Sequence, residues 1–141
     1  MDNETHVIKA GSTAHGQFET DVSIERAGWE WSSIRVLALP AGGSQEGTSG
    51  GSETVASGVS ELLVLPLSGG CVVEVNGETH VLNGREEVWS AITDYLYIPR
   101  ETTFTVRSES GGRFALPAAK ATRDLPVRYC PVTEVVTTLR G

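Results

Sequence analysis

The sequence predicts an all-β, single-domain protein built as a double-stranded β-barrel of the jelly-roll type. Short runs of alternating apolar and polar side chains recur along the chain, and turn signals separate them at the spacing of a sandwich or barrel. The 16 glycines and the scarcity of long apolar helical patterns also favour strands. The predicted barrel covers residues 17–132, after an N-terminal arm or edge strand over residues 1–16. A chain of 141 residues is long enough to bury one core.

The first strands are predicted from period-2 alternation. Residues Phe18 to Glu25 alternate in this way and indicate a half-buried strand. Ala27-Gly28 predicts a turn, and Ile34 to Leu39 the next strand. Residues 42–58 are rich in glycine, serine and threonine, which predicts a flexible loop with a mobile tip at Ser44 to Gly51. Two interpretations of this loop stay open: a functional lid or a tolerated surface insertion.

The centre of the chain predicts closely spaced strands. Leu62 to Leu67 is an almost continuous apolar run, typical of a strand buried on both faces. A turn at Ser68-Gly69-Gly70 leads into a strand at Cys71 to Val75, and Asn76-Gly77 is a strong hairpin signal. The remaining elements are strands at Glu78–Leu82, Val88–Trp89, Tyr95–Ile98, Phe104–Val106 and Phe114–Leu116, with a turn at Asn83-Gly84, for about nine or ten strands in all.

Charge and composition exclude several kinds of partner. The net charge of −7 argues against binding to nucleic acid or to an anionic membrane, since both need a basic patch. The sequence contains no run of about 18 apolar residues, so no membrane-spanning helix is predicted. The segment MDNETHVIKAG lacks the apolar region of a signal peptide, so a cytoplasmic location is predicted. Cys71 and Cys130 are then expected as free thiols, with a single disulfide as the alternative.

Several segments resemble the N-terminal half of the 5-deoxy-glucuronate isomerase family. They are AGWEWSSIRVLALPAGGS at Ala27–Ser44, ELLVLPLSGGCVVEVNG at Glu61–Gly77, DYLYIPRETTFTV at Asp94–Val106 and LRG at Leu139–Gly141. The resemblance implies a cupin-like barrel, one of two in a bicupin enzyme. That family converts the sugar acid 5-deoxy-glucuronate to 2-deoxy-5-keto-gluconate in myo-inositol catabolism, an aldose–ketose isomerisation.

The resemblance also implies a division of labour between the two barrels. The metal ligands of the family lie in the C-terminal cupin, so a divalent metal is expected there. No catalytic, cofactor-binding or metal residue is carried over onto this chain, which is expected to be metal-free and inactive alone. Residues 133–141 are interpreted as the start of a linker to that second cupin. A natural single cupin is the alternative.

The histidine pattern of a cupin metal site is missing from the sequence. Such a site takes an HxH pair, a glutamate and a later histidine, because divalent ions need several converging nitrogen or oxygen ligands. Glu61 lies where the glutamate is expected. The segments Thr54–Ser57 and Thr103–Phe104 stand at the histidine positions and hold none. The three histidines are interpreted as surface or strand residues, the last of them facing outward or on a hairpin face: His6, His15 and His80.

Other candidate groups each leave two interpretations. The neighbours Glu86-Glu87 are expected on opposite faces of a strand, as solvated charges and not as an acid–base pair. Trp29 and Trp31 flank a strand start and are expected to pack in the core or an interface, with sugar stacking as the alternative. Four arginines from different strands either converge to hold a carboxylate or face solvent and pair with acids: Arg35, Arg100, Arg107 and Arg113.

Three functions follow from these observations. The first is the scaffold domain of the isomerase, which would contact a small sugar acid in the parent enzyme. The second is a non-catalytic cupin that binds a sugar acid or a protein partner, since a barrel of this size holds one small ligand. The third is a dimerisation module, in which exposed apolar surface drives formation of a homo-oligomer at high concentration.

Overall fold

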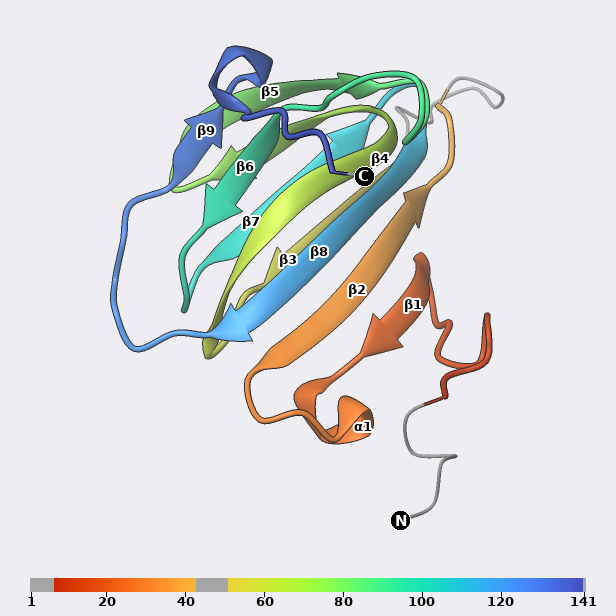
Figure 1. The fold of residues 1–141 in the computed structure, drawn as a ribbon, viewed down its shortest axis with the longest axis vertical. Coiled ribbons are helices and arrows are strands. Elements are labelled where there is room, and N and C mark those ends of the chain that lie inside the picture. Colours follow the sequence, from red (N-terminus) through yellow and green to blue (C-terminus); the bar gives the residue numbers. More distant parts are fainter. Residues whose placement is uncertain (1–6, 43–50, 141) are drawn as a thin grey trace.

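The computed structural model describes residues 7–42 and 51–140, and these fold into nine strands in two layers (Figure 1). The front layer has the order β1 (Phe18–Val22), β2 (Ser32–Leu39), β8 (Gly112–Lys120), β4 (Ser60–Val75), β6 (Tyr95–Ile98) and β9 (Arg128–Cys130). The back layer contains β3 (Gly51–Ala56), β7 (Thr103–Ser108), the second part of β4, and β5 (Glu78–Arg85). All strand pairs are antiparallel. The prediction of an all-β barrel is confirmed.

Strand β4 belongs to both layers. Its first part pairs with β6 and β8, and its second part pairs with β5 and β7. The turn predicted at Ser68-Gly69-Gly70 is wrong, because β4 continues through these residues with register shifts on both sides of Gly69. Gly69 takes a φ of 82°, and a Cβ on Gly70 would lie 2.7 Å from the carbonyl oxygen of Asn83. The glycines thus allow a bend inside the strand instead of a reversal.

The glycine-rich segment 42–58 is only partly a loop. Residues 51–56 form β3, which pairs along its whole length with β7, and Val55 is buried. Tertiary pairing therefore outweighs the loop-like composition here. The rest of the predicted mobile tip, residues 44–50, lies outside the described residues.

Two further predictions around β5 are wrong. Asn83-Gly84 is not a turn but lies inside β5, where Gly84 has a φ of 67°. Val88 and Trp89 are not a strand but part of an exposed loop between β5 and β6. The sequence signal failed in both places because a positive-φ glycine serves a bulge as well as a turn, and because an apolar pair on a loop resembles a short strand.

The N-terminal strand is shorter than predicted. Strand β1 ends at Val22, and Ser23 then caps the short helix α1 (Ile24–Ala27) by accepting a hydrogen bond from the backbone of Arg26. Gly28 ends this helix in the left-handed conformation, so the chain turns at Ala27-Gly28 as predicted. In the described part of the chain, no helix is long and apolar enough to cross a membrane.

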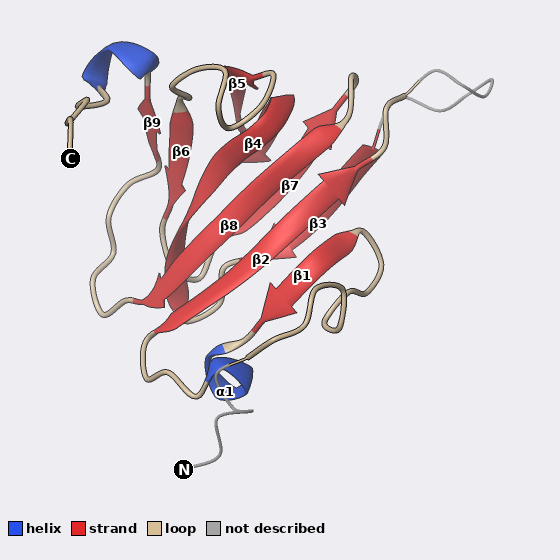
Figure 2. Ribbon diagram, turned by 45° about the vertical axis from the view of Figure 1, so that its right-hand side comes forward, coloured by secondary structure: helices blue, strands red, loops and turns tan. Residues whose placement is uncertain are grey.

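The chain ends beside the edge of the front layer. After β9, which the sequence analysis did not predict, a 3-10 helix covers Val132–Glu134 and the backbone then continues without regular structure to residue 140 (Figure 2). The three-residue strand β9 pairs with β6, placing Cys130 opposite Tyr95 and Arg128 opposite Tyr97. This pairing puts the last described segment next to the face of the front layer.

Candidate functional site

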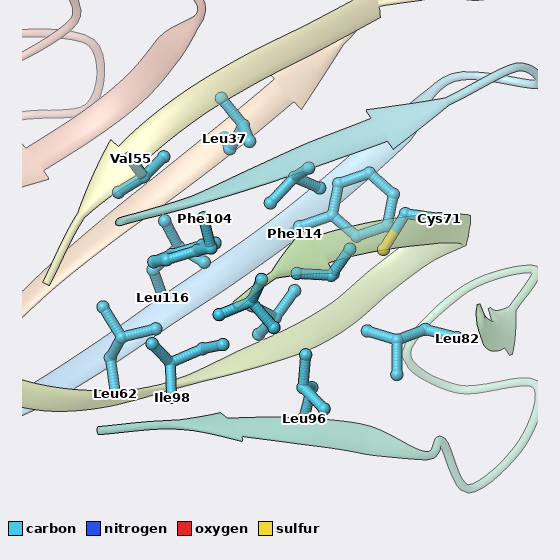
Figure 3. Packing of buried hydrophobic residues seen from close by; sticks show 14 of the residues in the cluster. Leu37, Val55, Leu62, Cys71, Leu82, Leu96, Ile98, Phe104, Phe114 and Leu116 are labelled. Carbon is cyan, nitrogen blue, oxygen red and sulfur yellow. The ribbon is translucent and has the colours of Figure 1, made fainter. Parts of the chain in front are cut away.

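The interior of the barrel is filled by apolar side chains. Buried residues from both layers meet in one cluster, in which the two phenylalanines Phe104 and Phe114 are at most 1% exposed (Figure 3). Val64, Leu96 and Leu116 are 0% exposed in the same cluster. A ligand site needs a cavity and a few polar groups that orient the ligand. The buried cluster presents apolar side chains to the centre of the barrel, so it offers a ligand few polar groups there.

The positions that matched a cupin metal site do not form one. Thr54 is exposed and its hydroxyl bonds to that of Thr105, whereas Ser57 is buried and donates to the carbonyl of Pro99. Glu61 alternates with the buried Leu62, so its side chain points away from the barrel interior. Among the described residues, no group of three His, Cys, Asp or Glu side chains is placed to hold an ion. The residues present therefore do not fit a metal in this barrel.

The histidines lie apart from one another. His15 is exposed, and its Nε2 is 2.6 Å from the carboxylate of Asp21. His80 lies on a face of the β4–β5 hairpin, one of its two expected positions, where it pairs with the inward-facing Val73 and is half-buried. Its Nε2 is 3.6 Å from the carboxylate of Glu78, too far for a hydrogen bond. His6 lies outside the described residues.

The four candidate arginines do not converge on a cavity. Three of them form separate surface ion pairs: Arg100 with Asp124, Arg107 with Glu74 and Arg113 with Glu19. Arg35 is the exception, because its guanidinium lies 5.7 Å from the ring centre of Phe18 and donates to the carbonyl of Ala56. Burial lowers the pKa of Arg35, against the opposing effect of Asp21. Of the two interpretations, pairing with acidic side chains at the surface is therefore correct for Arg100, Arg107 and Arg113.

The remaining candidates are also dispersed. Trp29 and Trp31 are 53% and 55% exposed, so neither packs in the core, and packing in an interface stays a prediction for both. Glu86 and Glu87 are exposed on the β5–β6 loop and not on a strand. Cys71 and Cys130 are both buried free thiols, as the sequence analysis expected.

Burial of Cys71 makes the stability of the fold decrease at alkaline pH. Burial, and secondarily the charge of Asp94, raises the pKa of this thiol from 9.0 to about 12. The pKa of the thiol is higher in the folded than in the unfolded state, so the unfolded chain loses its proton first as the pH rises. The free energy of unfolding therefore keeps its full value below pH 9 and falls as the pH rises toward 12, by at most roughly 1.4 kcal/mol per pH unit. We expect the free energy of urea unfolding to fall by roughly 1 kcal/mol between pH 9 and 10, because the unfolded thiol is only partly ionised there, and we expect Cys71→Ala to reduce this slope. Tyr97 and Tyr129 contribute only above their ordinary pKa of 10.0. An unchanged slope in the variant would contradict the assignment.

Asp94 forms a buried polar anchor that the sequence analysis missed. The residue is 0% exposed, and its two carboxylate oxygens accept hydrogen bonds from the backbone N–H groups of Asn83 and Gly84, each at 2.9 Å. The hydroxyl of Tyr129 on β9 donates to the same carboxylate at 2.5 Å. This hydrogen bond is the main cause that raises the pKa of Tyr129 to about 12. The carboxylate therefore ties β5 and β9 to the start of β6.

The outer face of the front layer is apolar, although no part of the described chain covers it fully. Side chains that alternate with the buried core residues point outward from four strands and are only half-buried. We call this surface the apolar outer face; it is formed mainly by Val36, Leu63, Leu65, Tyr95, Tyr97 and Pro117.

The opposite face, on the back layer, is mostly polar. There Thr54 bonds to Thr105, and Arg107 bonds to Glu74 across neighbouring strands. A polar outer surface is what an antiparallel sheet in contact with water normally presents. The contrast between the two layers marks the apolar outer face as the unusual surface of this barrel.

Two neighbouring hollows shape the apolar outer face. One has a volume of about 430 Å³ and is lined by Leu63, Tyr95, Tyr97, Leu125, Pro126, Arg128 and Cys130. The other has a volume of about 560 Å³ and lies beside the β5–β6 loop, with Leu65, Tyr95 and Trp89 in its wall. Tyr97 donates to Glu61 at 2.5 Å, and burial together with this carboxylate raises the pKa of Tyr97 to about 12.

The packed jelly-roll barrel, with strands in two layers, defines the chain as a cupin by its fold. Solved structures agree with this class. The chain matches an IolB-like protein from Salmonella typhimurium LT2 with a TM-score of 0.78 and 25% identity, over 92% of this chain and 47% of that one. It also matches the protein Ylba from E. coli with a TM-score of 0.60 and 15% identity, over 93% and 57% of the two chains. None of the curated protein sequences matches significantly.

The chain belongs to the KduI/IolB family, whose model matches residues 6–141. The family resemblance seen in the sequence is thereby confirmed. It spans about half the length of the IolB-like protein, 47% of that chain.

Proposed function

We propose that this chain is the scaffold half of a cytoplasmic 5-deoxy-glucuronate isomerase that acts in myo-inositol catabolism. The observation that carries the proposal is the match to the IolB-like protein, which covers 92% of this chain but only 47% of the longer protein. The packed interior supports the same division, because Phe104, Phe114 and Leu116 are buried in the barrel and offer a sugar acid no hydrogen bonds. The reaction then takes place in another part of the enzyme.

The proposed isomerisation needs certain catalytic groups, and these indicate what this domain contributes to the enzyme. An aldose–ketose isomerisation moves a proton between neighbouring carbons, so it needs a general base beside the substrate and a group that polarises the sugar oxygens. The polar side chains at the predicted ligand positions, Thr54 and Ser57, bond to protein groups. This domain contributes a rigid body to the enzyme.

An activity comparison tests the proposal. We expect the purified 141-residue chain to show no conversion of 5-deoxy-glucuronate, and the full product of its gene to show conversion to the ketose. Product formation is followed by NMR, and a titration calorimeter measures binding of the same uronate to the short chain. Turnover by the short chain would overturn the scaffold assignment. Absence of turnover by the full gene product would overturn the isomerase assignment.

A further inference from the structure

We propose that the apolar outer face is the contact surface of a symmetric homodimer, in which Trp89 of each copy enters the 430 Å³ hollow of the other. The proposal concerns a second copy of this chain and does not rest on the isomerase assignment.

Trp89 is the most exposed aromatic side chain among the described residues. Its side chain is 91% exposed, and its neighbours Val88 and Ile92 are 44% and 43% exposed. Tryptophan is enriched among the residues that dominate protein–protein binding energy. Three exposed apolar residues on one short loop, next to an apolar sheet face, are typical of a contact surface.

The loop that carries Trp89 is held in place by hydrogen bonds. The guanidinium of Arg85 donates to the carbonyls of Pro66, Val88 and Ala91, at 3.1, 3.4 and 3.1 Å. Ser90 closes the turn by donating to the carbonyl of Glu87 at 2.8 Å. A side chain presented on an ordered loop loses less conformational entropy on binding. Trp89 is therefore pre-positioned as an anchor.

The hollow has the properties of a receptor for an indole ring. Its volume of about 430 Å³ lies within the range of roughly 300–1,000 Å³ for small-molecule pockets. Leu63, Leu125 and Pro126 supply apolar walls, and Tyr95 and Tyr97 supply aromatic ones. Arg128 places a guanidinium at the same hollow, which favours contact with the face of an aromatic ring.

The protruding tryptophan and the hollow lie on the same face, which favours a second copy as the partner. Tyr95 lines both the hollow beside Trp89 and the receiving hollow, so the two features are neighbours. In a two-fold symmetric contact each copy must offer both complementary parts on one patch. The charges are also complementary in such a dimer. The exposed Glu87, two residues before Trp89, would approach Arg128 of the other copy, which lies beside the hollow. Arg128 already pairs with Glu134 at 2.9 Å, so Glu87 would join that pair.

Sedimentation analysis of the 141-residue chain over a concentration series tests the dimer. We expect a monomer–dimer equilibrium, with a dissociation constant that rises roughly ten-fold or more in Trp89→Ala. Trp29→Ala is the matched control, because Trp29 is also exposed, at 53%, but lies next to helix α1. Leu63→Glu should also favour the monomer. Its control Val81→Glu places the same charge on β5 of the back layer, where Val81 is 60% exposed, and should leave the dimer intact.

Two results would overturn the proposal. One is a monomer at every concentration, which would leave the apolar outer face to another occupant, such as a second barrel in a longer chain. The other is a dimer that Trp89→Ala leaves unchanged or that Val81→Glu disrupts, which would place the contact elsewhere. Circular dichroism of each variant separates loss of association from loss of folding. Association is measured without substrate, so its outcome is independent of the isomerase assay.

Discussion

Asp94→Ala is expected to destabilise the protein by roughly 2–3 kcal/mol, because it removes a buried carboxylate that accepts several part-buried hydrogen bonds. The backbone N–H groups of Asn83 and Gly84 and the hydroxyl of Tyr129 all donate to this carboxylate, which is 0% exposed. Without it, these partly buried donors lose their acceptor. Thermal unfolding should show a midpoint lower by on the order of 10 °C.

An exposed aspartate provides the control for this change. Asp124 pairs with Arg100 at the surface, where its side chain is 77% exposed. Asp124→Ala should leave the unfolding midpoint close to that of the wild type, because an exposed ion pair contributes little. Equal effects of the two substitutions would refute the anchor role of Asp94.

Gly84→Ala is expected to cost roughly 4 kcal/mol or more, because the added methyl group has no space. A Cβ at this position would lie 2.0 Å from the carbonyl oxygen of Gly69 and 2.8 Å from its carbonyl carbon. Both are backbone atoms of β4, so a side-chain rotation cannot relieve the clash. Gly84 also has a φ of 67°, which adds the usual penalty of the left-handed conformation for an alanine. Urea unfolding should show a large loss of stability, or the chain should fail to fold.

Gly77→Ala is the control that separates the two costs expected in Gly84→Ala, the steric clash and the unfavourable backbone conformation. Gly77 has a φ of 76°, similar to that of Gly84, but no atom lies within 4 Å of an added Cβ. The expected cost is only the conformational penalty of roughly 1–2 kcal/mol. If both glycine variants lose the same stability, the close approach of β4 and β5 is not what requires Gly84.

The strands that the sequence predicted well are those with a strong local pattern. Tyr95 to Ile98 was predicted with the bounds that the structure shows, and Ile34 to Leu39 lies within β2. The hairpin at Asn76-Gly77 is also present, between β4 and β5. In each case alternation or turn chemistry within a few residues determines the local structure.

The failures have a common physical cause, which is pairing between distant segments. Strand β3 has the composition of a loop and is ordered by β7, about 50 residues further along the chain. Glu61 matched a metal-ligand position in sequence, but the register of β4 turns it outward toward Tyr97. The role of Asp94 depends on Tyr129, 35 residues away. No local sequence pattern carries such information.

The passage of β4 through both layers has a consequence for how the barrel folds. One 16-residue strand supplies partners to β5, β6, β7 and β8, so neither layer is complete until β4 is in place. Neighbouring strands such as β4 and β8 are distant in sequence, and contacts of this kind slow folding because a long loop must close first. The two layers therefore form and come apart as one cooperative unit. The amide groups of β4 exchange with solvent only when the entire barrel opens.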